Sequence, residues 1–301
     1  MTNLGTPSTY HASIVAPQDV AISVEPATLV LGTNESADVS VHFTSTNTAF
    51  DLWYFGQLTW NDGKHAVVSP IAVQPVALRA PPVIRLSGAS GTATLPVAFG
   101  YAGPYTPRVH GLRAPLTDAA GHVLSGHVDD DPTNNFNFPN GPGIALQGIT
   151  VPPGQLYLRI ALFDEYTDGN DDLDLYLFFC PDGTTNRCSQ VGQSGSFTSN
   201  EKIDIPTPTP GTYIVAVHGF ETDQVAGGPG ANYSLFVWSF GVDDNVGNAT
   251  VTGPGSVNPG DRVELGLSWA NLAAGMRYLG AVSHETPRRL YALTLLDVSS
   301  P

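Results

Sequence analysis

The sequence predicts an all-β protein of tandem β-sandwich modules, and three observations lead to this prediction. Charged residues make up only 13% of the 301 residues, whereas the chain contains 32 glycines and 25 prolines. Short runs rich in Thr, Val and Tyr alternate between apolar and polar residues, which is the pattern of strands with one buried face. No long stretch has the apolar spacing that an amphipathic helix requires. Many short strands between turn-forming residues are typical of sandwiches and barrels.

The first module is predicted over residues 1–78. Its strands are expected at four runs of residues, 21–24, 37–43, 55–60 and 65–73. Between the last two runs lies Asp62-Gly63, a pair that tolerates the positive φ angles of a tight hairpin turn. Pro70 cannot donate a backbone hydrogen bond, so its strand is expected at a sheet edge or at a bulge. Residues 79–82 then predict a linker.

The second module is predicted over residues 83–241 and the third over residues 242–301. Strand candidates in the second module are 95–99, 156–163, 172–179, 212–217 and 233–240. Long irregular stretches such as 128–143 separate them, and many strands joined by long loops suggest a central β jelly roll. Strand candidates in the third module are 248–252, 262–269, 277–283 and 290–298. This last module is small for an independent sandwich, so it is expected to need its neighbour for stability.

The charge of the chain restricts its partners. With 12 basic against 27 acidic residues, the formal net charge is -15 at pH 7. Such a charge argues against nucleic acid or an anionic membrane as partner, and it serves either solubility or the attraction of calcium. No apolar run is long enough to cross a bilayer. Residues 2–5 lack the features of a signal peptide, so the chain is expected to be a fragment of a longer exported protein.

The two cysteines of the chain, Cys180 and Cys188, flank a turn signal at Pro181, Asp182 and Gly183. A local disulfide that closes a hairpin tip is favoured over two free thiols. A metal site would need more soft ligands than two cysteines supply. A disulfide implies an oxidising compartment, so a secreted, extracellular location is expected.

An acidic loop runs directly into an alternating strand over residues 163–178 (FDEYTDGNDDLDLYLF). Alternation places Asp172, Asp174 and Tyr176 on one face of this strand and the intervening leucines on the other. Carboxylates this close repel one another unless a cation or several backbone N–H groups hold them.

Calcium is the cation that such hard oxygen ligands prefer. The candidate calcium ligands are Asp164, Asp168, Asn170, Asp171, Asp172 and Asp174, although their spacing is not that of an EF-hand. The alternative is that Asp172 and Asp174 accept backbone N–H bonds and organise the loops without metal. A second acidic loop, residues 129–135, either ligates the same ion or forms an exposed turn.

No credible catalytic centre is present in the sequence. The eight histidines are scattered, and each is expected at the surface or at the edge of a sandwich. Close carboxylates imitate a glycosidase pair, but adjacent loop acids do not shape a sugar cleft. Aromatic residues that alternate with polar neighbours are expected mostly in cores, with a minority in an exposed strip for sugar or protein: Tyr54, Phe55, Trp60, Trp238, Phe240, Trp269 and Tyr278.

Several motifs of the first module resemble one family. They are residues 2–5 (TNLG), 10–17 (YHASIVAP), 24–26 (VEP) and 55–73 (FGQLTWNDGKHAVVSPIAV). Their succession is similar to the fibronectin type III-like domain that follows the catalytic domain of cucumisin-like subtilases. The family usually has Val where Leu4 stands and Arg where Val68 stands, so a salt bridge made by that Arg is absent here.

The second module resembles the bacterial pre-peptidase C-terminal domain in residues 171–177 (DDLDLYL), 210–219 (PGTYIVAVHG) and 231–235 (ANYSL). Domains of this type are β jelly rolls of secreted bacterial proteases, and some bind calcium. The third module is similar to short immunoglobulin-like modules that end some bacterial subtilases.

Together these resemblances imply the non-catalytic C-terminal accessory region of an extracellular subtilisin-like serine endopeptidase. Such a region would contribute to stability, folding or substrate attachment, with Ca²⁺ as the expected cofactor. Its partners would be the upstream catalytic domain and the surface of a protein or carbohydrate substrate. The chain itself is expected not to be an enzyme, because none of the Asp, His and Ser motifs of subtilases is present in it. The alternative is a free-standing extracellular binding or adhesion module for carbohydrate or matrix.

Overall fold

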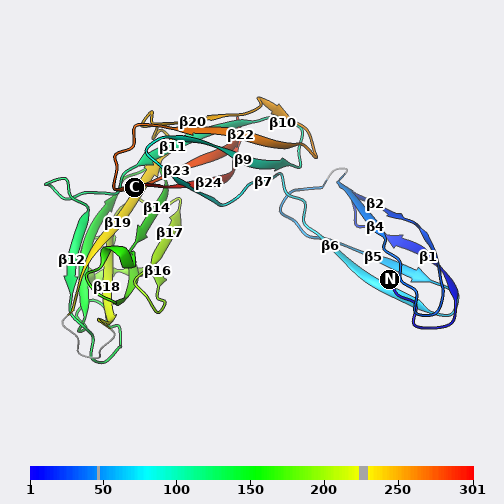
Figure 1. The fold of residues 1–301 in the computed structure, drawn as a ribbon, viewed down its shortest axis with the longest axis horizontal. Helices are drawn as coiled ribbons and strands as arrows, with labels where there is room; N and C mark the ends of the chain where they lie inside the picture. Colours follow the sequence, from blue (N-terminus) through cyan, green and yellow to red (C-terminus); the bar gives the residue numbers. More distant parts are fainter. Residues whose placement is uncertain (46–47, 224–229) are drawn as a thin grey trace. The chain divides into compact units, whose positions relative to one another are not determined.

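The computed structural model describes residues 1–45, 48–223 and 230–301 (Figure 1). Strands form nearly all of the regular structure, as predicted, and helical turns in the described ranges are two short 3-10 helices, η1 (Asp164–Tyr166) and η2 (Thr185–Arg187). No helix in these ranges is long and apolar enough to span a membrane. The chain divides into two compact units, the first built mainly from Met1–Arg79 and the second mainly from Tyr105–Gly255 and Val263–Pro301.

The first unit contains a four-stranded sheet in the order β3-β1-β5-β6 and a two-stranded sheet of β2 and β4. These strands are β1 (Ser8–Val15), β2 (Val20–Glu25), β3 (Thr28–Leu31), β4 (Ser40–Ser45), β5 (Tyr54–Asn61) and β6 (Ala66–Val73). Tyr10 and Trp60 lie in its core. The predicted hairpin turn is present, because Gly63 has a φ of 85° and Asp62 accepts the backbone N–H of Lys64. The strand that carries proline, β6, lies at the sheet edge as predicted.

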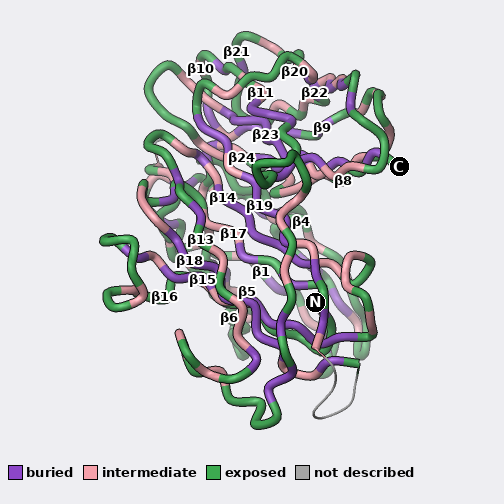
Figure 2. The backbone as a smooth tube through the Cα atoms, turned by 90° about the vertical axis from the view of Figure 1, so that its left-hand side faces the viewer, coloured by how far each residue is buried: buried purple, intermediate pink, exposed green. Residues whose placement is uncertain are grey.

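The predicted jelly roll is a sandwich of two antiparallel four-stranded sheets, which we call the central sandwich. Their strand orders are β12-β19-β14-β17 and β13-β18-β15-β16. The strands are β12 (Leu124–Val128), β13 (Ile144–Val151), β14 (Gln155–Ala161), β15 (Asp172–Phe179), β16 (Ser189–Ser194), β17 (Lys202–Pro206), β18 (Gly211–Glu221) and β19 (Ala231–Gly241). Leu158, Leu175, Val215 and Val237 are 0% exposed in the core between the sheets. Figure 2 shows buried positions concentrated on β14, β15, β18 and β19.

Two further four-stranded sheets form the third module, in the orders β11-β23-β24-β8 and β20-β22-β9-β7, and β10 pairs with β21. The strands are β7 (Leu78–Arg79), β8 (Val83–Ser87), β9 (Gly91–Phe99), β10 (Gly103–Pro104), β11 (Thr106–Arg113), β20 (Ala249–Thr252), β21 (Ser256–Val257), β22 (Arg262–Trp269), β23 (Met276–Thr286) and β24 (Arg289–Ser300).

This pairing differs from the predicted division into modules at 83–241 and 242–301. The strands of residues 83–113 were expected in the jelly roll, whereas β8 pairs with β24 and β11 pairs with β23. The central sandwich, which begins at β12, is therefore inserted between two halves of the third module. Alternation along a strand predicts the strand but not its partner, because pairing depends on contacts distant in sequence. The additional strands supply the core that the short C-terminal segment lacks.

Buried side chains join the central sandwich to the third module. One apolar cluster combines aromatic residues of β19 with aliphatic residues of β23 and β24: Phe236, Trp238, Phe240, Leu279, Ala281 and Leu295. Beside it lies Arg159 of β14, which is 4% exposed. Its Nε and Nη2 donate to Asp204 at 2.6 and 3.1 Å, and its Nη1 donates to Asp297 of β24 at 3.3 Å. The buried guanidinium of Arg159 thus forms ion pairs with residues of both modules.

Arg159→Met is expected to lower the free energy of unfolding by about 3 kcal/mol, because it leaves Asp204 and Asp297 without their shared cation. Urea denaturation followed by tryptophan fluorescence measures this loss. Arg108→Met is the matched control, since the side chain of Arg108 is 63% exposed and pairs with Glu285 at 3.4 Å. That surface pair is expected to contribute less than about 1 kcal/mol. Equal losses in the two variants would contradict the role assigned to Arg159.

Candidate functional site

The acidic strand predicted from the sequence is β15, and its two faces differ as expected. The three leucines, Leu173, Leu175 and Leu177, are 0% exposed in the core of the central sandwich. On the opposite face, Asp172 and Asp174 line a pocket together with the side chain that follows them on the same face, Tyr176. The polar face of β15 is therefore turned away from the core.

His218 is the centre of the buried charges on this face. It lies on β18 directly opposite Asp174 and is 1% exposed. Its Nδ1 lies 3.5 Å from an oxygen of Asp174, and its Nε2 lies 3.0 Å from an oxygen of Asp131. A neutral imidazole donates from one nitrogen only, so two carboxylate contacts favour the protonated ring. Burial opposes that charge, but the hydrogen bonds and charges of Asp174 and Asp131 outweigh it and raise the pKa of His218.

Asp131 fixes the second acidic loop against the sheet. It is 0% exposed and accepts the N–H groups of Thr133 and Asn135 at 2.9 and 3.0 Å. Burial raises the pKa of Asp131, but hydrogen bonds from His218 and Thr133 lower it overall to about 2. Of the two hypotheses for this loop, the exposed turn is wrong for Asp131. Its carboxylate organises the loop instead.

The loop that Asp131 anchors carries two aromatic rings onto the outer face of the sheet. Phe136 stacks on Tyr176 with ring centroids 3.6 Å apart, and Phe138 stacks on Phe178 at 3.8 Å.

The prediction that every histidine lies at a surface or an edge is wrong for His218, which is 1% exposed. The sequence signal that was available is the order of polar residues on β15 and β18, which places a histidine and an aspartate at facing positions.

Asp172 is buried, with 8% of its surface exposed, and the described residues offer no hydrogen bond to its Oδ1. Burial, followed by the charges of Asp174, Glu201 and Glu221, raises the pKa of Asp172 to about 6. The alternative in which backbone N–H groups hold this carboxylate therefore has no support at Asp172.

Three of the predicted calcium ligands lie in the loop before β15 and do not share a centre. Asp164 accepts a hydrogen bond from the side chain of Asn200. Asp168 accepts the backbone and side-chain amides of Asn232, which lower the pKa of Asp168. Asn170 is exposed. One oxygen of Asp164 and both oxygens of Asp168 thus accept hydrogen bonds from amide donors.

The remaining predicted ligands point in different directions. Asp171 contacts Asp223, whereas Asp172 lines the pocket and Asp174 faces His218. In the part of the chain that the structure describes, no three side chains of His, Cys, Asp or Glu are grouped so that they could hold a metal ion. The six residues do not fit one calcium ion as a set, and calcium binding stays a prediction.

A smaller pair of carboxylates, beside Gly169, fits a cation better. Asp171 is 6% exposed, its Oδ1 accepts the N–H of Asp223 at 3.0 Å, and its Oδ2 is buried without a partner among the described residues. A Cβ on Gly169 would lie 2.2 Å from Oδ1 of Asp223 and 3.1 and 3.2 Å from the two oxygens of Asp171. Burial and the charges of Asp223 and Asp168 raise the pKa of Asp171. Oxygens of both carboxylates thus lie close to the backbone of Gly169, where a side chain would clash with them.

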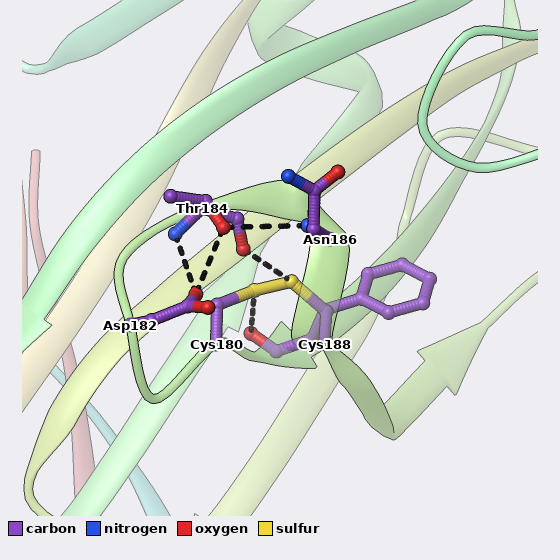
Figure 3. The surroundings of a disulfide bond; sticks show 6 residues. Cys180, Asp182, Thr184, Asn186 and Cys188 are labelled. Carbon is purple, nitrogen blue, oxygen red and sulfur yellow. Dashed lines mark hydrogen bonds between the residues drawn. A yellow bond between two sulfur atoms is a disulfide. The ribbon is translucent and has the colours of Figure 1, made fainter.

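The predicted disulfide between Cys180 and Cys188 is present in the connection from β15 to β16 (Figure 3). The turn between the cysteines is held by Asp182, which accepts the N–H and hydroxyl of Thr184 at 3.0 and 2.9 Å. The hydroxyl of Thr184 in turn accepts the N–H of Asn186 at 3.5 Å. The bond closes a hairpin tip, as the turn signal between the cysteines predicts.

Asp172→Asn is expected to raise the free energy of unfolding at about pH 7.5 by about 1 kcal/mol, since solvent screening reduces the effect of the pKa shift. The pKa of Asp172 is raised from 3.8 to about 6 by folding, so the wild-type chain loses stability as the pH rises between these values. The difference between variant and wild type should vanish below about pH 4, where both states are protonated. Urea denaturation at both pH values measures it. A less stable variant at neutral pH would show that Asp172 has a stabilising partner.

Comparison with known proteins agrees with this architecture. Residues 1–73 match the family described as fibronectin type-III domain, and residues 148–219 match the bacterial pre-peptidase C-terminal domain. Subtilisin-like protease SBT3.11 of Arabidopsis thaliana is 37% identical over 76 residues, which are 25% of this chain and 10% of that protein. Pyrolysin of Pyrococcus furiosus is 32% identical over 84 residues, which are 28% of this chain and 6% of that protein.

The chain therefore spans only 10% or less of the length of these relatives. The solved structure of the secreted serine protease VesC from Vibrio cholerae aligns with 79% of this chain and 48% of that chain at 12% identity. Its TM-score of 0.18 is too low to show a shared fold. Residues 1–73 are thus similar to fibronectin type-III domains and residues 148–219 to bacterial pre-peptidase C-terminal domains, and this combination, with the similarity to subtilisin-like proteases, supports a subtilase accessory region.

Proposed function

We propose that the chain is the accessory region of an extracellular subtilisin-like serine endopeptidase and that its first domain packs against the catalytic domain. The homology to subtilisin-like proteases supports the association with a catalytic domain. The disulfide between Cys180 and Cys188 supports an extracellular location, because such bonds persist in oxidising compartments.

The observation that carries this proposal is an exposed apolar face on the sheet β3-β1-β5-β6. Phe55 is 70% exposed, Val15 67% and Val68 52%. Trp53 is 57% exposed and stacks on Phe55, with ring centroids 6.4 Å apart. Contiguous apolar groups on a soluble domain are typical of a surface that another protein covers. We call these four residues the apolar face of the first domain.

The register of the sheet places three of these side chains on one side. Leu58 and Trp60 point into the core of the first unit, so the alternate residues of β5 point outward. Val15 pairs with outward-facing Gln57 of β5, and Val68 pairs with Thr59. Phe55 belongs to the same outward set of β5. An aromatic residue predicted for a core therefore lies in the exposed minority.

Peptide hydrolysis belongs, in this proposal, to the catalytic domain and not to this chain. His218 is a buried histidine that faces two carboxylates, Asp131 and Asp174. A catalytic base needs one ring nitrogen for an orienting carboxylate and the other for a nucleophile. Both nitrogens of His218 face carboxylates, so neither is available to a nucleophile.

Replacing Phe55 and Val15 by Ser in the full-length protease is expected to shorten the half-life of its activity at elevated temperature about fivefold. Loss of apolar contact worth about 1 kcal/mol corresponds to this factor. The isolated chain should keep its melting temperature, since both side chains are exposed in it.

Val191→Ser is the matched control, because Val191 is a 41% exposed strand residue of the central sandwich. An unchanged half-life of the Phe55 and Val15 variant would remove the support for docking through this face. If the variant instead lost binding to carbohydrate or matrix, the free-standing adhesion module would become the better proposal.

We also propose that calcium stabilises the central sandwich at Asp171 and Asp223. The unpartnered oxygen of Asp171 and the approach of an Asp223 oxygen to the same glycine, Gly169, support a cation there. Calcium prefers carboxylate and carbonyl oxygens, which this loop offers. Bound calcium would relieve the repulsion between the two carboxylates.

Millimolar calcium is expected to raise the melting temperature of the chain above its value in chelator, because a ligand of the native state shifts unfolding by mass action. Asp171→Asn should abolish this response. Asp129→Asn should keep it, since the side chain of Asp129 is 86% exposed and pairs with His127. Equal melting temperatures of the wild-type chain in calcium and in chelator would exclude the site.

A further inference from the structure

A pocket of about 290 Å³ opens on the outer face of β15, on the side away from Asp171. Two carboxylates, Asp172 and Asp174, lie in its wall. Three aromatic residues, Tyr176, Phe197 and Phe220, complete the lining together with residues 193–196. Such a combination of charge and aromatic surface is characteristic of ligand sites with a few fixed polar groups.

The carboxylates of this pocket share little positive charge. His218 contacts Asp174 but also Asp131, so one imidazolium serves two aspartates. Asp172 pairs with no basic side chain among the described residues, and its buried Oδ1 has no hydrogen-bond partner there. A buried carboxylate without a partner is costly, and a cation bound in the pocket would remove that cost.

The aromatic residues of the pocket favour an organic cation over a metal ion as its ligand. Tyr176 is held in place by the ring of Phe136, and Phe220 lies edge-on to His218 with ring centroids 6.2 Å apart. Aromatic faces attract ammonium and guanidinium groups. A guanidinium is planar, stacks on rings and donates two parallel hydrogen bonds to one carboxylate, so it uses both features of this pocket. A bare metal ion would use the carboxylates alone.

The loop that carries Phe197 is firmly built, although the ring itself is 94% exposed. Glu201 is 2% exposed and accepts the N–H of Ser196 at 2.7 Å. Ser199 is 0% exposed and donates to the carbonyl of Asp171 at 2.8 Å. The anchored loop therefore holds the exposed ring of Phe197 at the edge of the pocket, where it is accessible to a ligand.

Gly195 lines the pocket, and its backbone lies close to the carboxylate of Asp174. A Cβ at this position would lie 2.7 Å from Oδ1 of Asp174, which is closer than real Cβ atoms pack. A side chain at position 195 would therefore clash with this carboxylate.

We propose that this pocket binds the guanidinium of an arginine side chain presented by a peptide or protein, with Asp172 as its ionic partner and Phe197 as a stacking surface. The proposal is independent of any association with a protease, because it rests on the pocket alone. It is also separate from calcium binding at Asp171, which faces Asp223 and not the pocket.

Isothermal titration of the intact chain with N-acetyl-arginine amide at about pH 7.5 and low salt tests this proposal. Saturable binding is expected. Asp172→Asn should weaken it about tenfold, because a hydrogen-bonded charge pair is lost. Phe197→Ala should weaken binding about threefold, because an exposed cation–π contact contributes about this factor to an affinity. Neither change should unfold the chain, since Phe197 is exposed and Oδ1 of Asp172 has no hydrogen-bond partner among the described residues.

Asp129→Asn is the control for net charge, because it makes the same change at an 86% exposed side chain that does not line the pocket. It should keep the wild-type affinity. N-acetyl-citrulline amide, which has the same shape without the charge, should not bind. Equal affinity of the wild-type chain and Asp172→Asn for the arginine probe, or equal binding of the citrulline probe, would overturn the proposal. Binding of calcium at Asp172 without binding of the arginine probe would overturn it in favour of a metal site.

Discussion

The imidazole of His218 joins two elements that are far apart in the sequence. Asp131 belongs to the loop before β13, and Asp174 belongs to β15. Because both contacts are buried, the protonated ring and the two carboxylates stabilise one another only as a set. The loop that Asp131 anchors then places Phe136 on Tyr176. The aromatic cover of the outer sheet and the direction of Asp174 therefore depend on the same charge.

At the start of β15, two of the residues predicted for one calcium site, Asp171 and Asp172, lie in two separate acidic sites. Asp171 and Asp172 are adjacent, and their carboxylates reach opposite environments. Asp171 turns toward Asp223 and Gly169, whereas Asp172 turns toward the pocket. Each keeps one buried oxygen without a partner in the described residues. The calcium and guanidinium proposals therefore assign a different ligand to each of these two carboxylates.

Local features of the fold were predictable because they depend on residues close in sequence. The two faces of β15, the hairpin turn at Asp62-Gly63 and the disulfide between Cys180 and Cys188 follow from alternation and turn chemistry. These patterns concern one strand or one turn at a time. They require no knowledge of which elements meet in space.

Features that depend on distant partners could not be predicted in the same way. Alternation places His218 on the outer face of its sheet, but whether that face is exposed depends on the loop containing Asp131. The strands of residues 83–113 have ordinary patterns, and their partners lie beyond residue 261. Phe55 has the alternation of a core residue, but it belongs to the outward set of β5. In each case the sequence pattern does not tell which other strand or loop packs against the strand in question.

The two units offer surfaces of different physical character, and this difference bears on the proposed function. The apolar face of the first domain attracts a partner through burial of Phe55 and Val15, an interaction that salt does not screen. The pocket around Asp172 attracts a cation through charge, which salt and competing ions weaken where it is open to solvent. The first kind of contact suits permanent attachment to a catalytic domain, and the second suits exchange of ligands. The ion pairs of Arg159 and the shared apolar cluster anchor the central sandwich to the third module. A ligand in the pocket would therefore bind to a sandwich that is fixed to its neighbour within the second unit.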